Sequence, residues 1–214
     1  MSDIDKKKSV IGLYGEMQLS MILHEMGWQV HRAYIDEGID FTITKYWCPK
    51  CKKFSNQFIR KTENTQYKNA KCVTNLCEFC KDTELQIISK YLQVKTSEGN
   101  IVEGKDYRTF SFHPKIRYNM NDVYYVWIAV FNENNLITDI KEIENPIIHF
   151  YIFKTEDVKL FDNFDIDTYQ ITDNQKTSLK IDKDGNILDK GIKYSYECLK
   201  TFHNNFKVLE KINI

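Results

Sequence analysis

The first part of the chain shows a helical pattern followed by two alternating segments. Residues 3–25 predict a helix, because apolar side chains recur at helical spacing and Gly27 follows where a helix commonly ends. The apolar stripe consists of Val10, Leu13, Tyr14, Met17, Met21 and Ile22, with Leu19 and Leu23 beside them. Residues 28–34 and 39–46 alternate between apolar and polar positions, which predicts two strands joined by a turn at residues 36–38.

A third alternating segment, residues 87–97, predicts a strand with two different faces. Leu92 and Val94 fall on an apolar face that we expect to pack on a core, whereas Gln93 and Lys95 fall side by side on the other face. An amide and an ammonium group on one face of a strand are typical of a place where something charged is held.

The remaining chain predicts further strands and a final helix. Residues 123–131 and 147–154 are strongly apolar, which indicates two buried strands. A hairpin is predicted at residues 178–188, around Asp184-Gly185. Residues 194–212 predict a terminal helix whose apolar stripe contains Leu199, Phe202, Phe206 and Leu209.

Two Cys-x-x-Cys pairs, Cys48 with Cys51 and Cys77 with Cys80, stand between the second and third predicted strands. Four thiolates at this spacing form a tetrahedral metal site, and Zn²⁺ is its usual occupant. The sequence leaves two alternatives open: Cys72 could replace Cys77 or Cys80 as a ligand, and one pair could perform redox chemistry. The tandem arrangement favours a structural zinc.

The cysteine segment interrupts two strands that would otherwise form an antiparallel hairpin. It has too few apolar residues to fold by itself, so we expect zinc binding to fix its fold as a ribbon at the hairpin tip. The expected organisation is a core of residues 1–46 and 82–155, a zinc-ribbon insert of residues 47–81, and a C-terminal part. This last part, residues 156–214, completes the domain and serves dimerisation or recognition.

Length and composition indicate one sizeable core, since 42% of the 214 residues are apolar. No apolar run approaches the roughly 18 to 20 residues of a membrane span. The charged segment 1–10 lacks the apolar region of a signal peptide, so we expect a cytoplasmic protein with no membrane association. Thiols stay reduced there, and six cysteines then indicate metal binding rather than disulfides.

The charge distribution points to a nucleic-acid partner, although the formal net charge of the chain is zero. Residues 45–95 contain 11 Lys or Arg and 4 Asp or Glu, so a basic segment is set in an acidic remainder. Such local asymmetry is typical of a surface that binds phosphates, and a solvated charged face is the ordinary alternative.

The polar candidates follow the chain in a recognisable order: Glu16 in the first helix, Asp40 at the start of the second strand, and Gln93 and Lys95 on the third. Taken one at a time, Glu16 is an ordinary solvent-facing helix residue and Asp40 an ordinary turn or capping residue. Their order, placement and apolar surroundings carry more information than any one of them.

The segments Gly38-Ile39-Asp40-Phe41 and Gln93-Val94-Lys95, together with the helix glutamate, resemble the PD-(D/E)XK nuclease superfamily. The similarity is to its Mrr-like and Holliday-junction-resolvase-like branches, and it covers about residues 5–131 apart from the cysteine insert. It implies an α/β, restriction-endonuclease-like fold, in which helices flank a mixed central sheet. The zinc ribbon would be inserted in the hairpin between the Asp and Gln-x-Lys strands.

The resemblance also implies a catalytic Mg²⁺ or Mn²⁺ ion held by oxygen ligands. Asp40 would be the essential anionic ligand, with Asp36 as an alternative acid in the preceding turn. The Gln93 side-chain carbonyl and the Val94 backbone carbonyl would complete the protein's share. Glu16 would reach the ion directly or through a water. Lys95 would orient and acidify the attacking water or neutralise the transition state.

These expectations favour a Mg²⁺-dependent DNA endonuclease of a restriction or phage-defence kind that acts as a homodimer, and they leave room for a partner protein that selects the target. The expected nucleic-acid contacts are Lys8, Lys52, Lys53, Lys115 and Arg117. Two other functions remain open from the sequence. One is a catalytically degenerate nucleic-acid-binding zinc protein, and the other is a zinc-stabilised interaction protein.

Overall fold

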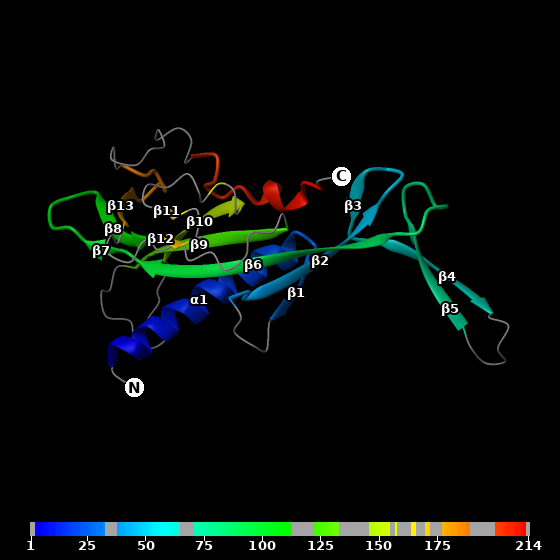
Figure 1. Ribbon diagram of the computed structural model, residues 1–214, viewed down its shortest axis with the longest axis horizontal. Coiled ribbons are helices and arrows are strands. Elements are labelled where there is room, and N and C mark those ends of the chain that lie inside the picture. Colours follow the sequence, from blue (N-terminus) through cyan, green and yellow to red (C-terminus); the bar gives the residue numbers. More distant parts are fainter. Residues whose placement is uncertain are drawn as a thin grey trace.

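The fold was determined as a computed structural model, which describes residues 3–32, 38–64, 71–112, 122–132, 146–154, 157, 164–165, 170–171, 177–188 and 200–212. It is a mixed α/β structure with a central sheet and one long helix (Figure 1). Asp36, Lys115, Arg117 and Cys198 lie outside the described residues. None of the helices in the part of the chain that the structure describes is long and apolar enough to cross a membrane.

The central sheet has the spatial order β1-β2-β6-β9-β10, and the short strand β3 (Lys53–Ser55) pairs with β2. Its main strands are β1 (Gln29–Arg32), β2 (Phe41–Cys48), β6 (Gln86–Glu98), β9 (Val123–Phe131) and β10 (Ile147–Lys154). Strands β1, β2 and β6 form an antiparallel meander, β9 runs parallel to β6, and β10 returns antiparallel to β9. The sheet is therefore mixed, as expected.

Strand β9 lies at the centre of the apolar packing, because every one of its residues is buried. Its alternate side chains belong to two different cores, one on each face of the sheet. Burial on both faces explains why its sequence is continuously apolar rather than alternating.

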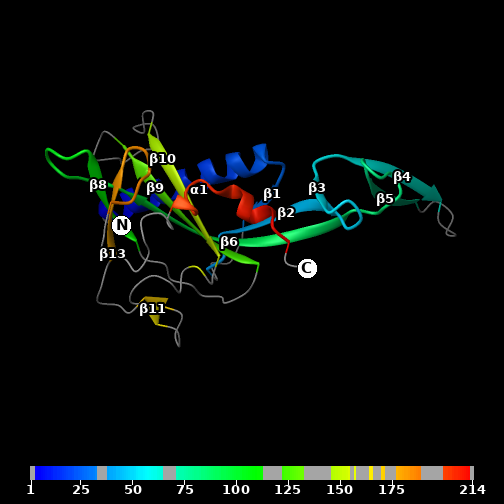
Figure 2. The same ribbon diagram turned by 90° about the horizontal axis from the view of Figure 1, so that it is seen from above.

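One face of the sheet is covered by α1 (Asp3–Glu25) and by the short 3₁₀ helix η2 (Phe206–Glu210), which lie on the same side in Figure 2. Leu19, Leu23 and Leu209 pack there against the apolar face of β6 and β9. Helix α1 ends as its sequence predicts, since Gly27 has φ 83° and its N–H bonds the His24 carbonyl at 2.9 Å.

The buried stripe of α1 differs from the expected one. Leu13, Met17 and Met21 are exposed, whereas the stripe that faces the sheet contains Ile11, Gly15, Leu19 and Leu23. The helix has apolar residues on more than one side, and the predicted stripe missed the glycine at which the helix comes closest to the sheet.

The other face of the sheet is covered by strands, not by helices as expected, in the part that the structure describes. A small sheet of order β13-β8-β7 packs there. Phe110, Leu179 and Ile181 of this sheet contact Trp127 and Tyr151 of the central one. Its strands are β7 (Asn100–Ile101), β8 (Tyr107–Phe112) and β13 (Thr177–Asp182), and a separate pair is formed by β11 (Phe164–Asp165) and β12 (Gln170–Ile171). The predicted hairpin around Gly185 is present, with Ile187 bridged to Ile181.

The predicted C-terminal helix is wrong for the described residues 201–205. This segment lies along the free edge of β10, where the Ile152 N–H donates to the Phe202 carbonyl at 3.0 Å and the Asn204 N–H to the Phe150 carbonyl at 2.6 Å. Pairing with an open strand edge satisfies backbone groups that a helix would have satisfied internally. Lys200 is helical and residues 206–210 form η2, whereas residues 194–199 lie outside the described part.

The cysteine segment forms a module at one end of the molecule (Figure 1). It begins where β2 ends at Cys48 and closes where β6 begins at Gln86, and it contains β3, β4 (Phe58–Asn64) and β5 (Lys71–Cys77). Strands β2 and β6 pair from Phe41 with Leu92 to Trp47 with Gln86, so the module extends a continuous antiparallel hairpin, as the sequence predicts.

Candidate functional site

Asp40 lies one residue before β2 and is bonded to the middle of β6. Its backbone N–H donates to the Leu92 carbonyl at 2.9 Å, and its Oδ2 accepts a hydrogen bond from the Val94 N–H at 2.5 Å. Because β2 and β6 pair Phe41 with Leu92, continuing the register by one residue places Asp40 opposite Gln93. The hairpin therefore brings the Asp segment and the Gln-x-Lys segment together.

The backbone of Val94 adds a carbonyl oxygen to this place. Within a strand, the N–H and C=O of one residue point to the same side. Since the Val94 N–H points to Asp40, the Val94 carbonyl is also directed to the side of β6 on which Asp40 lies. This place is just outside β2, whose first residue is Phe41. Gln93 is buried at 4% exposure, and Lys95 follows two residues later on the same face with an exposed side chain.

Glu16 reaches this place from α1. Burial raises the pKa of its carboxyl above the ordinary 4.5; the charge of Arg32 acts against this rise, that of Asp40 adds to it, and that of Lys95 opposes it. Glu16 thus lies within electrostatic range of both Asp40 and Lys95. The structure brings together the four residues that the sequence singles out.

Gly15 explains how α1 comes close enough to β6. A Cβ atom at Gly15 would lie 2.2 Å from the Thr96 Oγ1, far inside van der Waals contact. Any larger residue would push the helix away from the strand, and Glu16 would move with it. A glycine at this helical position is therefore a packing requirement of the site.

Two residues of the site were not predicted from the sequence. Arg32, the last residue of β1, forms an ion pair with Glu16, with 2.9 Å between Nη2 and Oε2. Tyr125 of β9 lies opposite Gln93 and is buried. Burial, and then the charge of Asp40, raise the pKa of its hydroxyl. Only the pairing of β1 with β2 and of β6 with β9 reveals them; along the sequence, Tyr125 is one aromatic residue in an apolar strand.

The donor set fits a hard divalent cation. Two carboxylates, one amide carbonyl and one backbone carbonyl offer only oxygen ligands, which Mg²⁺ prefers. A cation here would also offset the repulsion from Asp40, which adds to the effect of burial in raising the pKa of Glu16.

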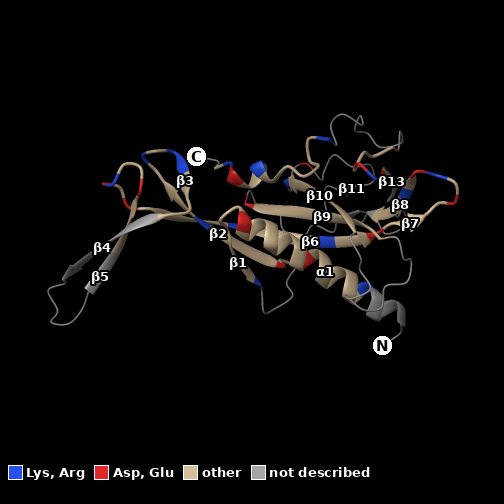
Figure 3. Ribbon diagram, turned by 180° about the vertical axis from the view of Figure 1, so that it is seen from behind, with Lys and Arg blue, Asp and Glu red and all other residues tan. Residues whose placement is uncertain are grey.

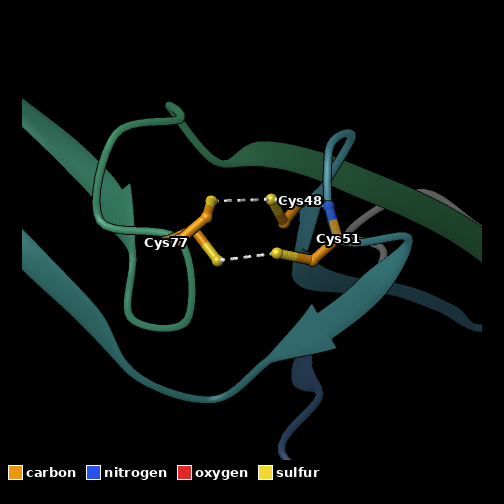
Figure 4. A group of neighbouring side chains, drawn as sticks. Cys48, Cys51 and Cys77 are labelled. Carbon is orange, nitrogen blue, oxygen red and sulfur yellow. Dashed lines mark hydrogen bonds between the residues drawn. The ribbon is translucent and has the colours of Figure 1, made fainter.

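The second site is formed by the four predicted cysteines (Figure 4). Their Sγ atoms all lie within 4.8 Å of one another, with 3.7 Å between Cys48 and Cys80 and 3.9 Å between Cys51 and Cys77. Four thiolates placed tetrahedrally around Zn²⁺, each about 2.3 Å from it, lie about 3.8 Å apart. The cluster is therefore compatible with a structural zinc, and its sulfur separations are too long for disulfides, which measure about 2.05 Å.

The two Cys-x-x-Cys pairs have matching backbones. In each, the residue after the second cysteine, Lys52 or Lys81, has a positive φ of 57° or 61°. In each, its N–H returns to the carbonyl of the first cysteine, at 2.9 Å for Cys48 and 2.8 Å for Cys77. The pairs are therefore two copies of one turn that face each other across the cluster.

The thiols require a cation to share this space as thiolates. Burial, followed by hydrogen bonds to Cys80, Cys48 and Cys77, raises the pKa of Cys51 to about 12. A bound Zn²⁺ reverses this effect, since a coordinated thiol is deprotonated. Cys72 lies on β5, five residues before Cys77, and the described cluster is complete with the four cysteines of the two pairs.

An ion pair joins the two turns at their outer side. Lys50 Nζ lies 2.5 Å from Asp82 Oδ2. The hydrogen bond from Lys50, with a second one from Thr83, lowers the pKa of Asp82 to about 2. The two turns of the module are thus joined by an ion pair in addition to the cysteine cluster.

The expected nucleic-acid contacts are only partly described. Lys8 is exposed on α1, and Lys52 and Lys53 are exposed on the module, where Lys and Arg gather on and beside β3 (Figure 3). Lys52 lies over the Trp47 ring and Lys53 over the Phe79 ring, each with Nζ 5.7 Å from the centroid. They line an open groove of about 600 Å³, together with Lys45, Phe54, Asn56, Gln57, Glu78, Phe79 and Glu210.

Two basic residues of the segment 45–95 are buried, and each is bonded to groups of the protein itself. Lys45 is buried, and its Nζ lies 2.7 Å from both Glu210 Oε1 and the Met26 carbonyl. Lys90 is buried at 1% exposure, with its Nζ 3.2 Å from the Tyr124 hydroxyl and 3.3 Å from Asp122. The basic surface is therefore smaller than the sequence count indicates.

No protein-family model, no curated protein and no solved structure matches this chain.

Proposed function

We propose that this protein is a Mg²⁺-dependent DNA endonuclease of a restriction or phage-defence kind, with a restriction-endonuclease-like core and a structural zinc module. The observation that carries the proposal is the convergence of Glu16, Asp40, Gln93 and Lys95. They come from a helix, a strand start and a strand, in the order that the PD-(D/E)XK superfamily would place them. The antiparallel β1-β2-β6 meander beside α1 supports the same interpretation.

In this proposal, the oxygen atoms of Asp40, Gln93, Val94 and Glu16 hold the cation. Mg²⁺ supplies charge neutralisation at phosphorus and lowers the pKa of water. The Val94 N–H holds one oxygen of the Asp40 carboxylate. The orientation of the carboxylate, and with it the direction of its second oxygen, is therefore fixed. The exposed ammonium of Lys95 reaches toward the solvent side, where it orients the attacking water and stabilises negative charge on the phosphate.

The zinc module extends the surface on which DNA would lie. Lys52 and Lys53 offer two exposed positive charges beside the exposed ring of Phe79, a combination suited to phosphates and bases. Double-strand cutting by one site per chain requires two copies, so the proposal includes a homodimer. A partner protein that selects the target is compatible with it.

The test is cleavage of mixed plasmid and phage DNA with Mg²⁺ or Mn²⁺, wild type beside Lys95→Ala. Discrete fragments that disappear in the variant support a sequence-specific nuclease built on this site. A smear that disappears supports a nuclease without sequence specificity. If folded, zinc-loaded wild type cuts with neither metal, the proposal of a self-sufficient nuclease is wrong.

A second candidate function is a catalytically degenerate nucleic-acid-binding zinc protein. The observation that favours it is Gln93, an uncharged residue opposite Asp40, which gives the site less negative charge than a third carboxylate would. Under this alternative, wild type binds DNA at low salt, where phosphate contacts are strongest, and cuts with neither metal.

A further inference from the structure

The ion pair between Arg32 and Glu16 lies at the candidate cation site. Arg32 is the last residue of β1 and pairs with Phe41, the residue that follows Asp40. Its Nη2 lies 2.9 Å from Glu16 Oε2. The guanidinium is therefore paired with one of the carboxylates that the proposed function assigns as ligands of the cation.

The two partners differ in their exposure. The side chain of Arg32 is 64% exposed, whereas that of Glu16 is 20% exposed. Exposed ion pairs contribute little to the stability of a fold, so holding α1 and β1 together is a weak reason for this pair. The exposed guanidinium can leave Glu16 without unpacking anything, while Glu16 remains in place.

A cation at Glu16 and Asp40 changes the balance of charge around Arg32. Without the cation, Arg32 offsets the negative charge of Glu16, which also feels the charge of Asp40. With it, the guanidinium competes for the same Glu16 oxygens and is repelled by the ion. A new anionic partner then becomes favourable for Arg32.

The phosphate backbone of the proposed substrate supplies such a partner. A guanidinium presents parallel N–H donors that match two phosphate oxygens, which an ammonium does not. Arg32 is on the solvent side of the site, from which a polyanion approaches.

We propose that Arg32 is a phosphate-binding residue of this site, held by Glu16 in the absence of a divalent cation and transferred to the nucleic-acid backbone when the cation binds. The inference rests on the proposed function and adds to it a residue and an order of events. It predicts that a divalent cation binds more weakly in the absence of DNA, because the cation must first displace Arg32.

The first test uses Mn²⁺ alone, titrated into the zinc-loaded chain without nucleic acid and followed by electron paramagnetic resonance. Arg32→Gln removes the competing charge and keeps the side-chain length, so we expect it to bind Mn²⁺ at least about fivefold more tightly than wild type. Lys105→Gln, which removes an exposed charge from the turn between β7 and β8, is the matched control and should bind as wild type. Equal or weaker Mn²⁺ binding by Arg32→Gln would overturn the competition.

The second test measures DNA binding by fluorescence anisotropy with and without Mn²⁺, in a Lys95→Ala background that keeps all cation ligands. We expect Mn²⁺ to strengthen duplex binding by Lys95→Ala and to have little effect on Lys95→Ala/Arg32→Gln. An equal gain in both chains would overturn the phosphate role.

Cleavage separates this inference from the proposed function. If wild type cuts DNA, we expect Arg32→Gln to lower kcat/KM about 100-fold. Arg32→Lys should restore wild-type Mn²⁺ competition better than it restores cleavage, since it keeps the charge and loses the paired donors. Unchanged kcat/KM in Arg32→Gln would refute the role of Arg32 while the nuclease stands. If wild type does not cut, the nuclease fails, and the Mn²⁺ and DNA-binding measurements still decide the role of Arg32.

Discussion

The carboxylate of Asp40 accepts a hydrogen bond from the backbone N–H of Val94, 2.5 Å from its Oδ2, across the open end of the β2–β6 hairpin. This bond fixes the orientation of the acid on which the proposed chemistry depends. It also links an isolated Asp before a strand to the middle of a segment more than fifty residues away.

Asp40→Asn separates the charge of this residue from its structural bond. The amide oxygen can still accept the Val94 N–H, so the chain should fold with nearly wild-type stability, whereas the essential anionic ligand is lost. We expect cleavage with Mg²⁺ to fall at least about 100-fold and DNA binding at low salt to remain. Gel-based cleavage and fluorescence anisotropy on the same preparations measure both.

Asp106→Asn, at an exposed position in the turn before β8, is the control for removing one carboxylate and should cleave as wild type. Wild-type cleavage by Asp40→Asn would show that another acid holds the cation. Asp36 would then be the candidate to test.

The two glycines of α1 make a matched pair for the packing of the site. Alanine at Gly15 would place Cβ 2.2 Å from Thr96 Oγ1, whereas alanine at Gly12 has no atom within 4 Å. We expect Gly15→Ala to destabilise the fold by about 1–3 kcal/mol through overpacking. Gly12→Ala should stabilise it by up to about 1 kcal/mol through helix propensity. Urea denaturation measures both.

Gly15→Ala should also reduce cleavage, because α1 carries Glu16 away from Asp40 as it moves. Thr96→Ala should recover part of the lost stability in the double variant, since it removes the atoms that clash. Equal stabilisation by both glycine substitutions would show that α1 does not approach β6 closely at Gly15.

The sequence predicts the strands of the central sheet well because their patterns are local. The predicted segments 123–131 and 147–154 coincide with β9 and β10, in which most residues are apolar and buried. The paired cysteines also predict the metal cluster, since Cys-x-x-Cys spacing fixes two ligands on one turn. In both cases, the residues that decide the structure lie close together in the sequence.

The failures have a common physical cause, which is contact between distant segments. The buried stripe of α1 depends on where the helix touches β6, and Gly15 carries no apolar side chain to reveal it. Residues 201–205 show a helical pattern, yet the free edge of β10 offers them backbone partners. Arg32 and Tyr125 join the site only through strand pairing, which no local pattern specifies.

The cysteine cluster predicts which thiols a metal requires. Cys77→Ser removes one of four ligands, so we expect loss of bound zinc and increased proteolysis between β2 and β6. Cys72→Ser should keep about one zinc per chain, because the two Cys-x-x-Cys pairs supply a complete tetrahedral set. Elemental analysis of the purified proteins gives the metal content, and limited proteolysis reports on the module.

The reciprocal result would favour the alternative assignment. Zinc retained in Cys77→Ser and lost in Cys72→Ser would place Cys72 among the ligands. Wild type free of zinc, with linked cysteines in each pair, would instead favour redox chemistry.

Two histidines hold the C-terminal segment against β10 and make stability depend on pH. His149 Nδ1 lies 2.9 Å from His203 Nε2, and His149 Nε2 lies 3.0 Å from the Lys183 carbonyl. A carbonyl only accepts, so His149 Nε2 donates to it and the neutral His149 Nδ1 accepts from His203. Burial lowers the pKa of both rings; the Lys183 carbonyl, Asp182 and Asp184 oppose this at His149. At His203, the charge of His149 lowers the pKa further and that of Asp182 opposes it.

The sign of the effect follows from these directions. Both folded pKa values lie below the ordinary 6.5, so the unfolded chain binds more protons as the pH falls through that value. The free energy of unfolding should therefore be fully supported by this pair above about pH 7 and decrease between there and the lower folded pKa values.

His203→Gln removes one ring and should make this decrease shallower, whatever its effect on stability at pH 8. Urea denaturation at several pH values between 8 and 5 measures the slope. His24→Gln, at an exposed position on α1, should keep the wild-type slope. An unchanged slope in His203→Gln would mean that the pair does not titrate with folding.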